Sequence, residues 1–362
     1  MIPVLHLRQG TALYGADRAL LELSASLPGP YLPIVGAIGR PGTPDDLGEE
    51  ARRRGLQAVR FESASRLDLR CARAVARVSI ERGVRLLHAH DFKALFLAVI
   101  AGLLARIPVV ATFHGDTRST AAVRLYEALA RVLGNFTSGV AAVSRALEVR
   151  LRRWVRAAPV SFVPNGLGSP RPLTGAERAA ARRRFEVDPQ AYCVAVIGRL
   201  APEKGHRVLF EAARGLGATL LIAGDGPLRE ELRMLARGLD IRFAGYVEPA
   251  RDVFAAADVI ALPSFTEGLP LVALEALALG RCLVASAVGE LPELLSGGAG
   301  VLVPPGDTAA LAAALRSLGS ASAREACRKE GLLRARRYEV AAMAGAYASL
   351  YGRALSRRRS SR

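Results

Sequence analysis

The chain alternates short runs of Val, Ile and Leu with longer stretches in which apolar residues recur every three or four positions. The short runs predict buried β-strands, and the longer stretches predict helices with one apolar face. Strands and helices that alternate along a whole chain require parallel strands joined by crossover helices. The pattern therefore predicts an α/β protein.

In the first half, the pattern predicts strands at residues 4–7, 31–38, 57–61, 86–89, 109–113, 140–143 and 160–163. Helices are predicted between them at residues 16–27, 67–82, 92–105 and 120–133. The longest apolar run, residues 94–105, is too short to span a bilayer, so we expect it to form a buried helix.

Residues 164–175 are rich in Gly and Pro and predict a connector without regular structure, at which we place the domain boundary. Strands follow at residues 193–197, 219–223, 259–262, 283–285 and 301–303, with a helix at 271–279. We expect domains over residues 1–165 and 166–335, then a C-terminal helix and basic tail over 336–362. Both domains predict doubly wound parallel sheets, in which ligands bind beyond the carboxyl ends of the strands.

Charge is distributed unevenly along the 362 residues, whose formal net charge is +17. It is +10 over residues 1–165, −1 over 166–323 and +8 over 324–362. A basic first domain and tail would attract an anionic membrane, a phosphate-bearing acceptor or nucleic acid. However, 47 of the 50 basic residues are Arg, so an arginine-rich coding composition explains the charge equally well.

The cysteines and histidines give no sign of a metal site. The four cysteines are far apart and form no C-x-x-C pair, which favours a reducing cytoplasm over a disulfide framework or a zinc ribbon. His88 and His90 lack a third ligand at metal-site spacing, and we expect them to be structural. Residues 1–8 predict a strand and not a secretory signal. We therefore expect neither a cofactor nor a metal.

The first chemical motif, GRLAPEKG, follows the strand at 193–197. Arg199 and Lys204 are five residues apart on a strand-to-helix loop, where two cations can bind one diphosphate. The alternative is a solvated surface turn, but Lys is rare in this chain, which favours a function for Lys204. The turn GDGP at residues 224–227 lets a ligand approach the backbone closely and is a weak signal by itself.

The second motif, EGLPLVALE, lies between a buried strand and an apolar helix. Gly268 and Pro270 shape a loop whose free amides, with the helix N-terminus behind them, form a site for phosphate or sugar hydroxyls. Glu267 and Glu275 are pure hydrogen-bond acceptors that can hold the hydroxyls of two parts of one ligand. The alternative for Glu275 is a buried structural acid, which is costly without partners.

In this order and spacing, GRLAPEKG, GDGP and EGLPLVALE resemble the donor-binding half of the family 4 retaining glycosyltransferases. The resemblance covers essentially the whole chain, more loosely in the first half. It implies the fold called GT-B, in which two Rossmann-like domains face each other across a cleft. It also implies an N-terminal domain that binds the acceptor, a C-terminal domain that binds a nucleotide sugar, and a C-terminal helix within residues 336–362 that crosses back to the N-terminal domain.

By this resemblance, Arg199 and Lys204 neutralise the leaving diphosphate, Glu267 contacts the transferred sugar and Glu275 holds the ribose hydroxyls. The remaining residues implied for donor binding in this half are Gly198, Gly268, Leu269, Pro270 and Leu271.

In the first half, residues 113–115, FHG, resemble the family's His-Gly turn, in which His114 faces the sugar and acts in catalysis. Taken alone, His114 is equally well interpreted as a structural histidine. Residues 13–20 resemble the glycine-rich loop that touches the diphosphate, with Gly15 as its glycine. Tyr14 stands where such enzymes often have a first glycine, and Asp17 where they often have Glu. Residues 163–166, VPNG, match the usual hinge.

The implied activity is transfer of a hexose to an acceptor hydroxyl with retention and without a metal. We expect a glycan or lipid-linked acceptor, in polysaccharide, lipopolysaccharide or glycolipid synthesis, and no nucleic-acid partner. The expected location is the cytoplasm, with peripheral contact to an anionic membrane. Two alternatives are a sugar-nucleotide epimerase of the same fold and a non-catalytic basic protein that binds membrane or nucleic acid.

Overall fold

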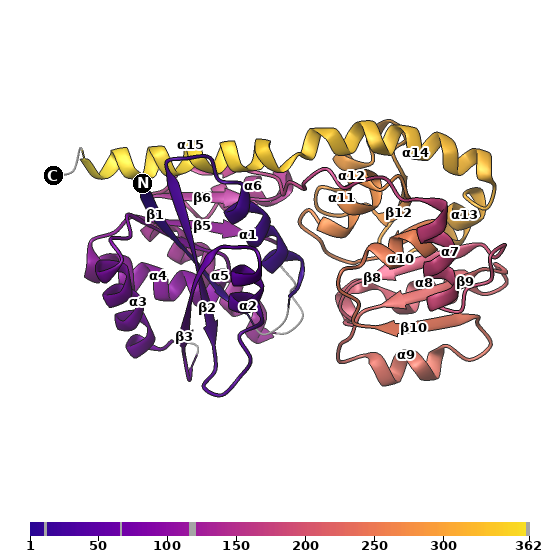
Figure 1. Cartoon of the computed structure of the whole chain (residues 1–362), viewed down its shortest axis with the longest axis horizontal. Helices are drawn as coiled ribbons and strands as arrows, with labels where there is room; N and C mark the ends of the chain where they lie inside the picture. The colour runs from indigo at the N-terminus through magenta and orange to yellow at the C-terminus, as the bar shows by residue number, and fades with distance from the viewer. Residues whose placement is uncertain (11–12, 66, 116–120, 360–362) are drawn as a thin grey trace. The chain divides into compact units, whose positions relative to one another are not determined.

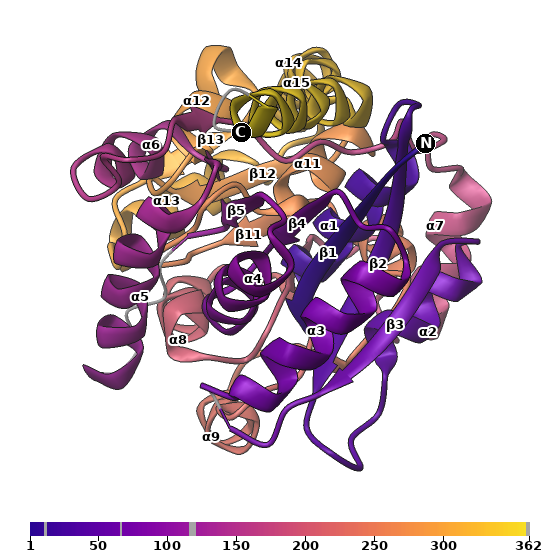
Figure 2. The ribbon, with the colours of Figure 1, turned by 90° about the vertical axis from the view of Figure 1, so that its left-hand side faces the viewer.

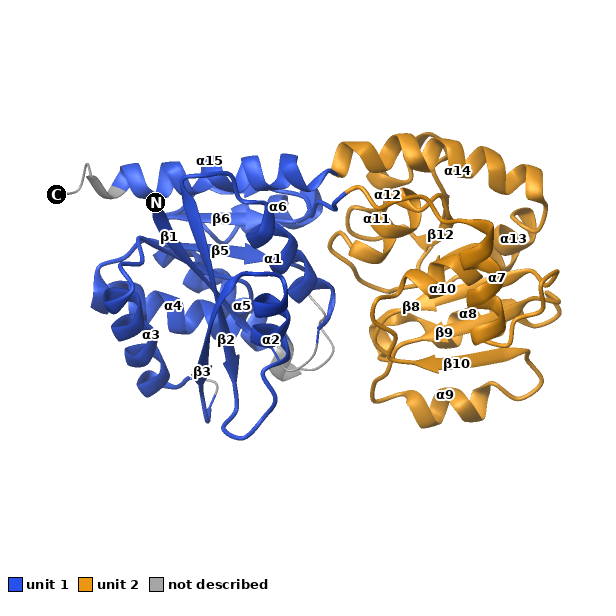
Figure 3. Cartoon of the chain, viewed as in Figure 1, with its two compact units in different colours: residues 1–168, 339–362 blue, residues 169–338 orange. Residues whose placement is uncertain are grey.

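A computed structural model describes residues 1–10, 13–65, 67–115 and 121–359. Its contacts divide the chain into two compact units (Figure 3). Unit 1 comprises Met1–Gly168 together with Glu339–Arg362, and unit 2 comprises Ser169–Tyr338. The unit boundaries thus fall at 168/169 and 338/339, where the sequence placed domain boundaries at 165/166 and 335/336. Residues 360–362 of the basic tail and Thr120, the first residue of a predicted helix, lie outside the described residues.

Unit 1 contains a parallel sheet in the order β3-β2-β1-β4-β5-β6-β7, of which Figure 1 labels β1, β2, β3, β5 and β6. Its strands are β1 (Ile2–Gln9), β2 (Tyr31–Gly39), β3 (Gln57–Glu62), β4 (Leu86–Ala89), β5 (Val109–Phe113), β6 (Gly139–Ala142) and β7 (Val160–Phe162). Its helices are α1 (Gly15–Ser26), α2 (Asp46–Arg53), α3 (Leu69–Glu81), α4 (Phe92–Ala105), α5 (Ala121–Leu133), α6 (Arg145–Arg152) and α15 (Val340–Arg359), with the 3₁₀ turn Gly134–Phe136.

The two faces of the unit 1 sheet pack against different helices (Figure 2). On one face, Leu5, Leu87 and Val109 pack against α3 and α4. On the other, Val4, Leu86 and Val110 pack against α1 and α15. Since side chains alternate along a strand, even-numbered residues of β1, β4 and β5 all face α15.

Unit 2 contains a parallel sheet in the order β10-β9-β8-β11-β12-β13. Its strands are β8 (Cys193–Ile197), β9 (Thr219–Ala223), β10 (Ile241–Gly245), β11 (Val259–Leu262), β12 (Cys282–Ser286) and β13 (Val301–Val303). Its helices are α7 (Gly175–Arg184), α8 (His206–Ala213), α9 (Arg229–Leu235), α10 (Arg251–Ala256), α11 (Leu271–Ala278), α12 (Leu291–Leu294), α13 (Thr308–Ser317) and α14 (Ala321–Ala335), with the 3₁₀ turns Pro202–Lys204, Ser296–Gly298 and Arg336–Tyr338.

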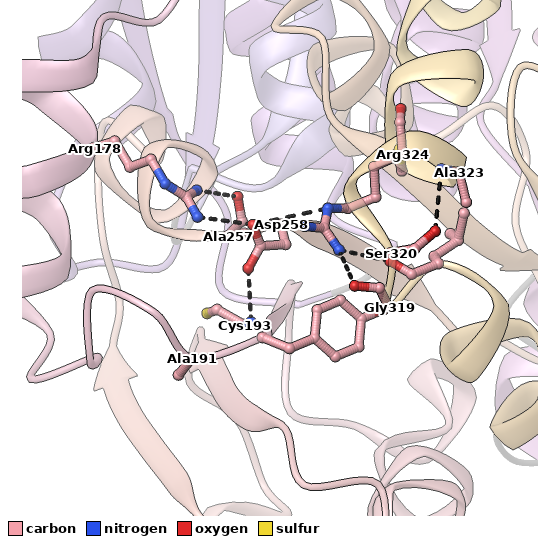
Figure 4. A network of polar contacts seen from close by, with 12 residues as sticks. Arg178, Ala191, Cys193, Ala257, Asp258, Gly319, Ser320, Ala323 and Arg324 are labelled. Carbon is pink, nitrogen blue, oxygen red and sulfur yellow. Dashed lines mark hydrogen bonds and ion pairs between the residues drawn. The ribbon is translucent and has the colours of Figure 1, made fainter.

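A buried ionic network anchors the amino ends of β8 and β11 in unit 2 (Figure 4). Asp258 accepts hydrogen bonds from Arg178 at 2.8 Å, Arg182 at 2.8 Å and the Cys193 amide at 2.9 Å. Burial alone would raise the pKa of Asp258, but the Cys193 amide and the two guanidinium groups hold it below its ordinary value. The network joins α7 to the sheet at the edge opposite the loops that carry the sequence motifs.

The predicted α/β fold with two doubly wound parallel sheets is confirmed. The sequence pattern missed β10, an edge strand of only five residues that are all half-buried. Residues 94–105 lie within α4, as predicted, although Leu103 and Leu104 at its end are exposed. Among the described residues, no helix combines the length and the hydropathy needed to cross a bilayer.

Candidate active site

Two residues of the sequence motifs meet at the carboxyl edge of the unit 2 sheet. β8 and β11 are neighbours, so the loops that follow them leave the sheet at the same edge. Lys204 lies in the 3₁₀ turn after β8, and Glu267 lies in the loop after β11. Lys204 Nζ is 2.7 Å from Glu267 Oε1. The fold thus pairs two predicted site residues that are 63 positions apart in the sequence.

Glu267 is held firmly in place, because its Oε1 also accepts a hydrogen bond from Ser264 Oγ at 2.7 Å. The side chain of Glu267 is 9% exposed, whereas that of Lys204 is 26% exposed. Two donors, the Lys204 ammonium and the Ser264 hydroxyl, thus fix one oxygen of this largely buried carboxyl group. Ser264 was not predicted as a site residue, although it stands only three positions before Glu267 in the same loop.

The two loops pack backbone to backbone at Gly205. This residue adopts φ +68°, and a Cβ on it would lie 2.0 Å from the Pro263 carbonyl oxygen. The Phe265 amide donates to the Glu203 carbonyl at 2.8 Å beside this contact. Only glycine satisfies both the positive φ and the close approach. The glycine that ends GRLAPEKG therefore fixes the position of Lys204 against the second motif.

Arg199 forms an ion pair with Glu203, four positions later in the same loop. The Arg199 side chain is 42% exposed and that of Glu203 is 8% exposed, so a buried acid orients a cation that reaches solvent. The Leu200 amide donates to Asp225 at 3.0 Å, which places the GDGP turn against this loop. Glu203 was not predicted as a site residue, although an acid four positions after Arg199 in the same motif was a signal for it.

The EGLP loop is supported from the other side by the turn before α12. The Glu290 amide donates to the Gly268 carbonyl at 2.8 Å, and Gly289 (φ +61°) approaches the same carbonyl so closely that a Cβ would lie 2.3 Å away. Leu269 and Leu271 are almost fully buried, so these two residues offer a ligand their backbone and not their side chains. This supporting turn was not identified from the sequence.

Glu275 lies in the second turn of α11, and its side chain is nearly buried at 8% exposure. Its helix neighbours Leu274 and Ala276 are buried apolar residues. Both interpretations of Glu275, a structural acid and a ligand for ribose hydroxyls, are compatible with this position. Its role remains a prediction.

Of the predicted site residues, His114 and Gly15 belong to unit 1. His114 follows β5, and its Nε2 lies 3.4 Å from His90 Nδ1. Burial, together with the nearby Arg8 cation, lowers the pKa of His114 to about 3. Gly15 is the first residue of α1, and no heavy atom lies within 4 Å of the position of an added Cβ. The His114 imidazole is neutral at physiological pH, because its pKa is lowered so far.

An ion pair beneath the start of α1 was not identified from the sequence. Arg8 Nε lies 2.5 Å from Asp17 Oδ1, and Arg8 Nη1 donates to the His90 carbonyl at 3.1 Å. Asp17 also accepts a hydrogen bond from the Tyr14 amide at 3.0 Å and so caps the helix. This ion pair connects the first turn of α1, which begins at Gly15, to the carboxyl ends of β1 and β4.

A third histidine lies beside His88 and His90. The fold places His6, from β1, so that one nitrogen of each ring lies within 4.8 Å of the others, a spacing that a metal ion could bridge. However, His88 Nδ1 contacts Tyr351 Oη and His88 Nε2 contacts Thr112 Oγ1, each at 2.7 Å. Both His88 nitrogens are thus occupied by hydroxyl groups, and the cluster is held by hydrogen bonds.

Models of two protein families match the chain in tandem. The model described as Glycosyltransferase Family 4 matches residues 15–168, and the model described as Glycosyl transferases group 1 matches residues 191–320. The first match begins at Gly15 and covers His114. The second contains the three motifs of unit 2.

The chain is similar to several curated proteins. It is 34% identical over 259 residues to a phosphatidyl-myo-inositol mannosyltransferase of Mycobacterium leprae, which covers 67% of this chain and 66% of that protein. It is 37% identical over 157 residues to an alpha-D-kanosaminyltransferase of Streptomyces kanamyceticus, covering 40% of each. It is also 37% identical over 182 residues to a D-inositol 3-phosphate glycosyltransferase of Geodermatophilus obscurus, covering 43% of this chain and 39% of that protein. The chain thus spans just under two thirds of the first relative and about two fifths of the other two.

Solved structures share the fold over almost the whole chain. HepE of Anabaena, solved in complex with UDP-glucose, superposes with a TM-score of 0.86 at 22% identity and covers 97% of this chain and 100% of that one. Sucrose-phosphate synthase from Thermosynechococcus elongatus superposes with a TM-score of 0.79 at 22% identity, covering 98% and 100%. Two Rossmann-like units of the GT-B type, two family models matched in tandem and the motif residues together place the chain in a family. The chain belongs to the family 4 glycosyltransferases.

Proposed function

We propose that the protein transfers a hexose from a nucleotide-sugar donor to an acceptor hydroxyl, with retention at the anomeric carbon and without a bound metal. The observation that carries this proposal is the contact between Lys204 and Glu267 where β8 and β11 end. It places a cation and a carboxylate side by side at the edge where parallel sheets bind ligands. A nucleotide sugar needs both, since its diphosphate is anionic and its sugar hydroxyls donate hydrogen bonds.

In this proposal, Lys204 and Arg199 stabilise the charge that develops on the diphosphate as the sugar leaves. The backbone of Gly198 and of Gly268 to Leu271 lies beside the donor, and Glu267 contacts the transferred sugar. Groups fixed in advance toward a developing charge supply much of the catalysis in many enzymes. The acceptor hydroxyl attacks on the face from which the diphosphate leaves, and the leaving phosphate oxygen takes its proton. Glu275 holds the ribose and His114 contacts the sugar.

The experiment measures donor binding and sugar transfer in matched variants. UDP, GDP and ADP, each free and as the glucose or mannose conjugate, are screened by the rise in melting temperature that bound ligand causes. Lys204→Ala and Glu275→Ala should abolish that rise and lower transfer by about 100-fold or more while the protein stays folded. Arg207→Ala is the control, because Arg207 is an exposed cation of α8 paired with Glu231. Wild-type rates in both test variants would refute the donor site.

The same assay distinguishes the alternatives. Isomerisation of the donor sugar without an acceptor would identify an epimerase. Failure of every nucleotide sugar to bind would favour a non-catalytic protein.

For the acceptor, we propose a glycan or lipid-linked hydroxyl, in glycolipid, polysaccharide or lipopolysaccharide synthesis. The name of the Mycobacterium leprae relative, a phosphatidyl-myo-inositol mannosyltransferase, supports the glycolipid alternative. Transfer of radiolabelled sugar to extracted lipids tests this choice, and label recovered only in water-soluble glycans would contradict it.

We further propose that unit 1 contacts an anionic membrane from the cytoplasmic side. Besides the basic charge, unit 1 exposes an apolar stripe on α5 and the turn after it, with members 4, 3 and 4 positions apart: Leu125, Leu129, Val132 and Phe136. Trp154 is also exposed. It lies next to this stripe, because Asn135 donates hydrogen bonds to the carbonyl oxygens of both Val132 and Trp154. Apolar side chains flanked by arginines suit the interface of an anionic bilayer.

Flotation with vesicles that contain phosphatidylglycerol tests this contact. Leu129→Ser/Phe136→Ser should lower the bound fraction severalfold at low salt. Met234 of unit 2 is as exposed as Phe136, at 65%. Met234→Ser should therefore leave the bound fraction unchanged. Absence of wild-type binding at low salt would contradict the proposal.

A further inference from the structure

Four of the five histidines in the sequence lie together in unit 1. His6 of β1 pairs in register with His88 of β4, and His90 and His114 follow β4 and β5. His6 and His88 occupy even-numbered strand positions, so their side chains lie on the sheet face that is covered by α15, and ring contacts place His90 and His114 beside them.

Three of these rings form a chain of hydrogen bonds toward the carboxyl edge of the sheet. His6 Nδ1 is 3.2 Å from His90 Nε2, and His90 Nδ1 is 3.4 Å from His114 Nε2. His88 packs beside the chain with a ring-centre distance of 3.9 Å to His90, but its own nitrogens contact Tyr351 and Thr112. His114 is therefore connected to His6 through His90 alone.

The three hydrogen-bonded rings of His6, His90 and His114 admit only two arrangements of protons. This is because a neutral imidazole has one N–H donor and one acceptor nitrogen. If His6 donates through Nδ1, then His90 donates to His114, and the proton of His114 is on Nδ1. In the reverse arrangement, His114 donates through Nε2 and the proton of His6 is on its own Nε2. A single choice thus sets all three rings.

The buried end of the chain favours the first arrangement. His6 is fully buried, and its Nε2 has no hydrogen-bond partner in the part of the chain that the structure describes. In the reverse arrangement that nitrogen would carry a buried N–H without an acceptor, which is rarer in proteins than an acceptor without a donor. The first arrangement leaves only a lone pair there.

We propose that His6 and His90 are positioning residues that fix His114 as the neutral tautomer with its proton on Nδ1. Its Nε2 accepts from His90, so Nδ1–H is the group that remains for a ligand. This inference rests on the proposed function in one respect, that His114 faces the donor sugar. His114 then donates a hydrogen bond to a sugar oxygen, and it does not serve as the base that deprotonates the acceptor.

The surroundings keep the three rings neutral, as this arrangement requires. Burial lowers the pKa of His6 to about 3 and the pKa of His90 well below its ordinary value. Arg8 donates to the His90 carbonyl at 3.1 Å, and its charge opposes protonation of both His90 and His114. Arg8 in turn is paired with Asp17, so its charge is fixed in position.

The tautomers are read directly from a long-range ¹H–¹⁵N spectrum of protein labelled at histidine, whose five rings are assigned by substitution. The wild type should show the His114 proton on Nδ1. His6→Phe removes the first donor and should make the two His114 nitrogens average between tautomers. His6→Asn supplies an amide N–H near the Nδ1 position and should restore the single form. His88 takes no part in the hydrogen bonds between His6, His90 and His114, so His88→Gln should leave the His114 signals unchanged.

A wild-type His114 proton on Nε2, or an unchanged His114 tautomer in folded His6→Phe, would overturn the proposal. So would one equivalent of a metal that copurifies with the wild type and is lost in His6→Phe. The wild-type spectrum is decisive even where a variant does not fold.

Kinetics then separate this proposal from the proposed function. We expect His6→Phe to lower kcat about tenfold with the KM for the donor within about twofold, and His6→Asn to recover most of kcat. If the tautomer is as proposed but His114→Ala transfers sugar at the wild-type rate, the chain of imidazoles stands and the assigned role of His114 fails.

Discussion

The position of Lys204 depends on the next residue, because the backbone of Gly205 packs directly against Pro263. We expect Gly205→Ala to lower the free energy of unfolding by about 3 kcal/mol or more, since it adds a steric clash to the strain of a positive φ. Urea denaturation measures this loss. Gly215→Ala is the control, with φ +71° but no atom within 4 Å of the added Cβ. It should lose only about 1–2 kcal/mol, and an equal loss in both variants would contradict the role of the contact.

Individual residues also show what the sequence supports and what it does not. Arg199, Lys204 and Glu267 were predicted because each stands in a recognisable loop after a strand. His6 was missed, because it lies 82 positions before His88 and becomes its neighbour only through the strand order. The predicted residues are held in place by Glu203, Ser264 and Gly289. These contacts depend on distances in the folded structure, which the spacing of residues along the sequence does not give.

At the scale of elements, the ends of β8 and β11 have separate tasks. Their carboxyl ends carry the candidate site, and their amino ends are joined by Asp258 to α7. We expect Asp258→Asn to destabilise unit 2 by about 3–5 kcal/mol, because it removes the negative charge that balances Arg178 and the buried Arg182. The melting of unit 2 measures this. Nucleotide binding by the folded variant should match that of the wild type, and a large loss of affinity would contradict the separation of tasks.

Elements with strong periodicity were the most predictable. The buried strands β8, β9, β11 and β12 were predicted within one residue of their observed bounds. β10 was missed because an edge strand needs no continuous apolar run, and its five residues, IRFAG, include Arg242 and end at Gly245, with φ +68°. The pairing that makes β10 a strand comes from β9 and not from its own sequence.

At the scale of the whole molecule, the histidine cluster predicts sensitivity to acid. The four rings have lowered pKa values in the folded state, about 3 for His6 and His114, against about 6.5 in the unfolded chain. Below pH 6.5 the unfolded state therefore binds more protons, and stability falls as the pH falls. Each histidine contributes about 1.4 kcal/mol per pH unit while only its unfolded form is protonated.

Urea denaturation at pH 7.5, 6 and 5 tests this expectation. The free energy of unfolding of unit 1 should decrease between pH 6.5 and 5, and less steeply in His88→Gln, which lacks one of the four groups. Equal slopes in the wild type and this variant would show that the histidines are not the cause.

Unit 1 is assembled from two separate stretches of chain, and this has a consequence during protein synthesis. Tyr347 and Tyr351 of α15 pack on Val4 and Leu86, and Tyr31 donates to the Ala348 carbonyl at 3.0 Å. The ribosome releases all of unit 2 before it releases α15. Unit 2 can therefore fold while unit 1 still lacks this helix. We expect unit 2 to fold first, the reverse of the usual order in which domains fold from the N-terminus as they emerge. Until α15 arrives, the nascent chain exposes one apolar face of its first sheet, where a chaperone would bind.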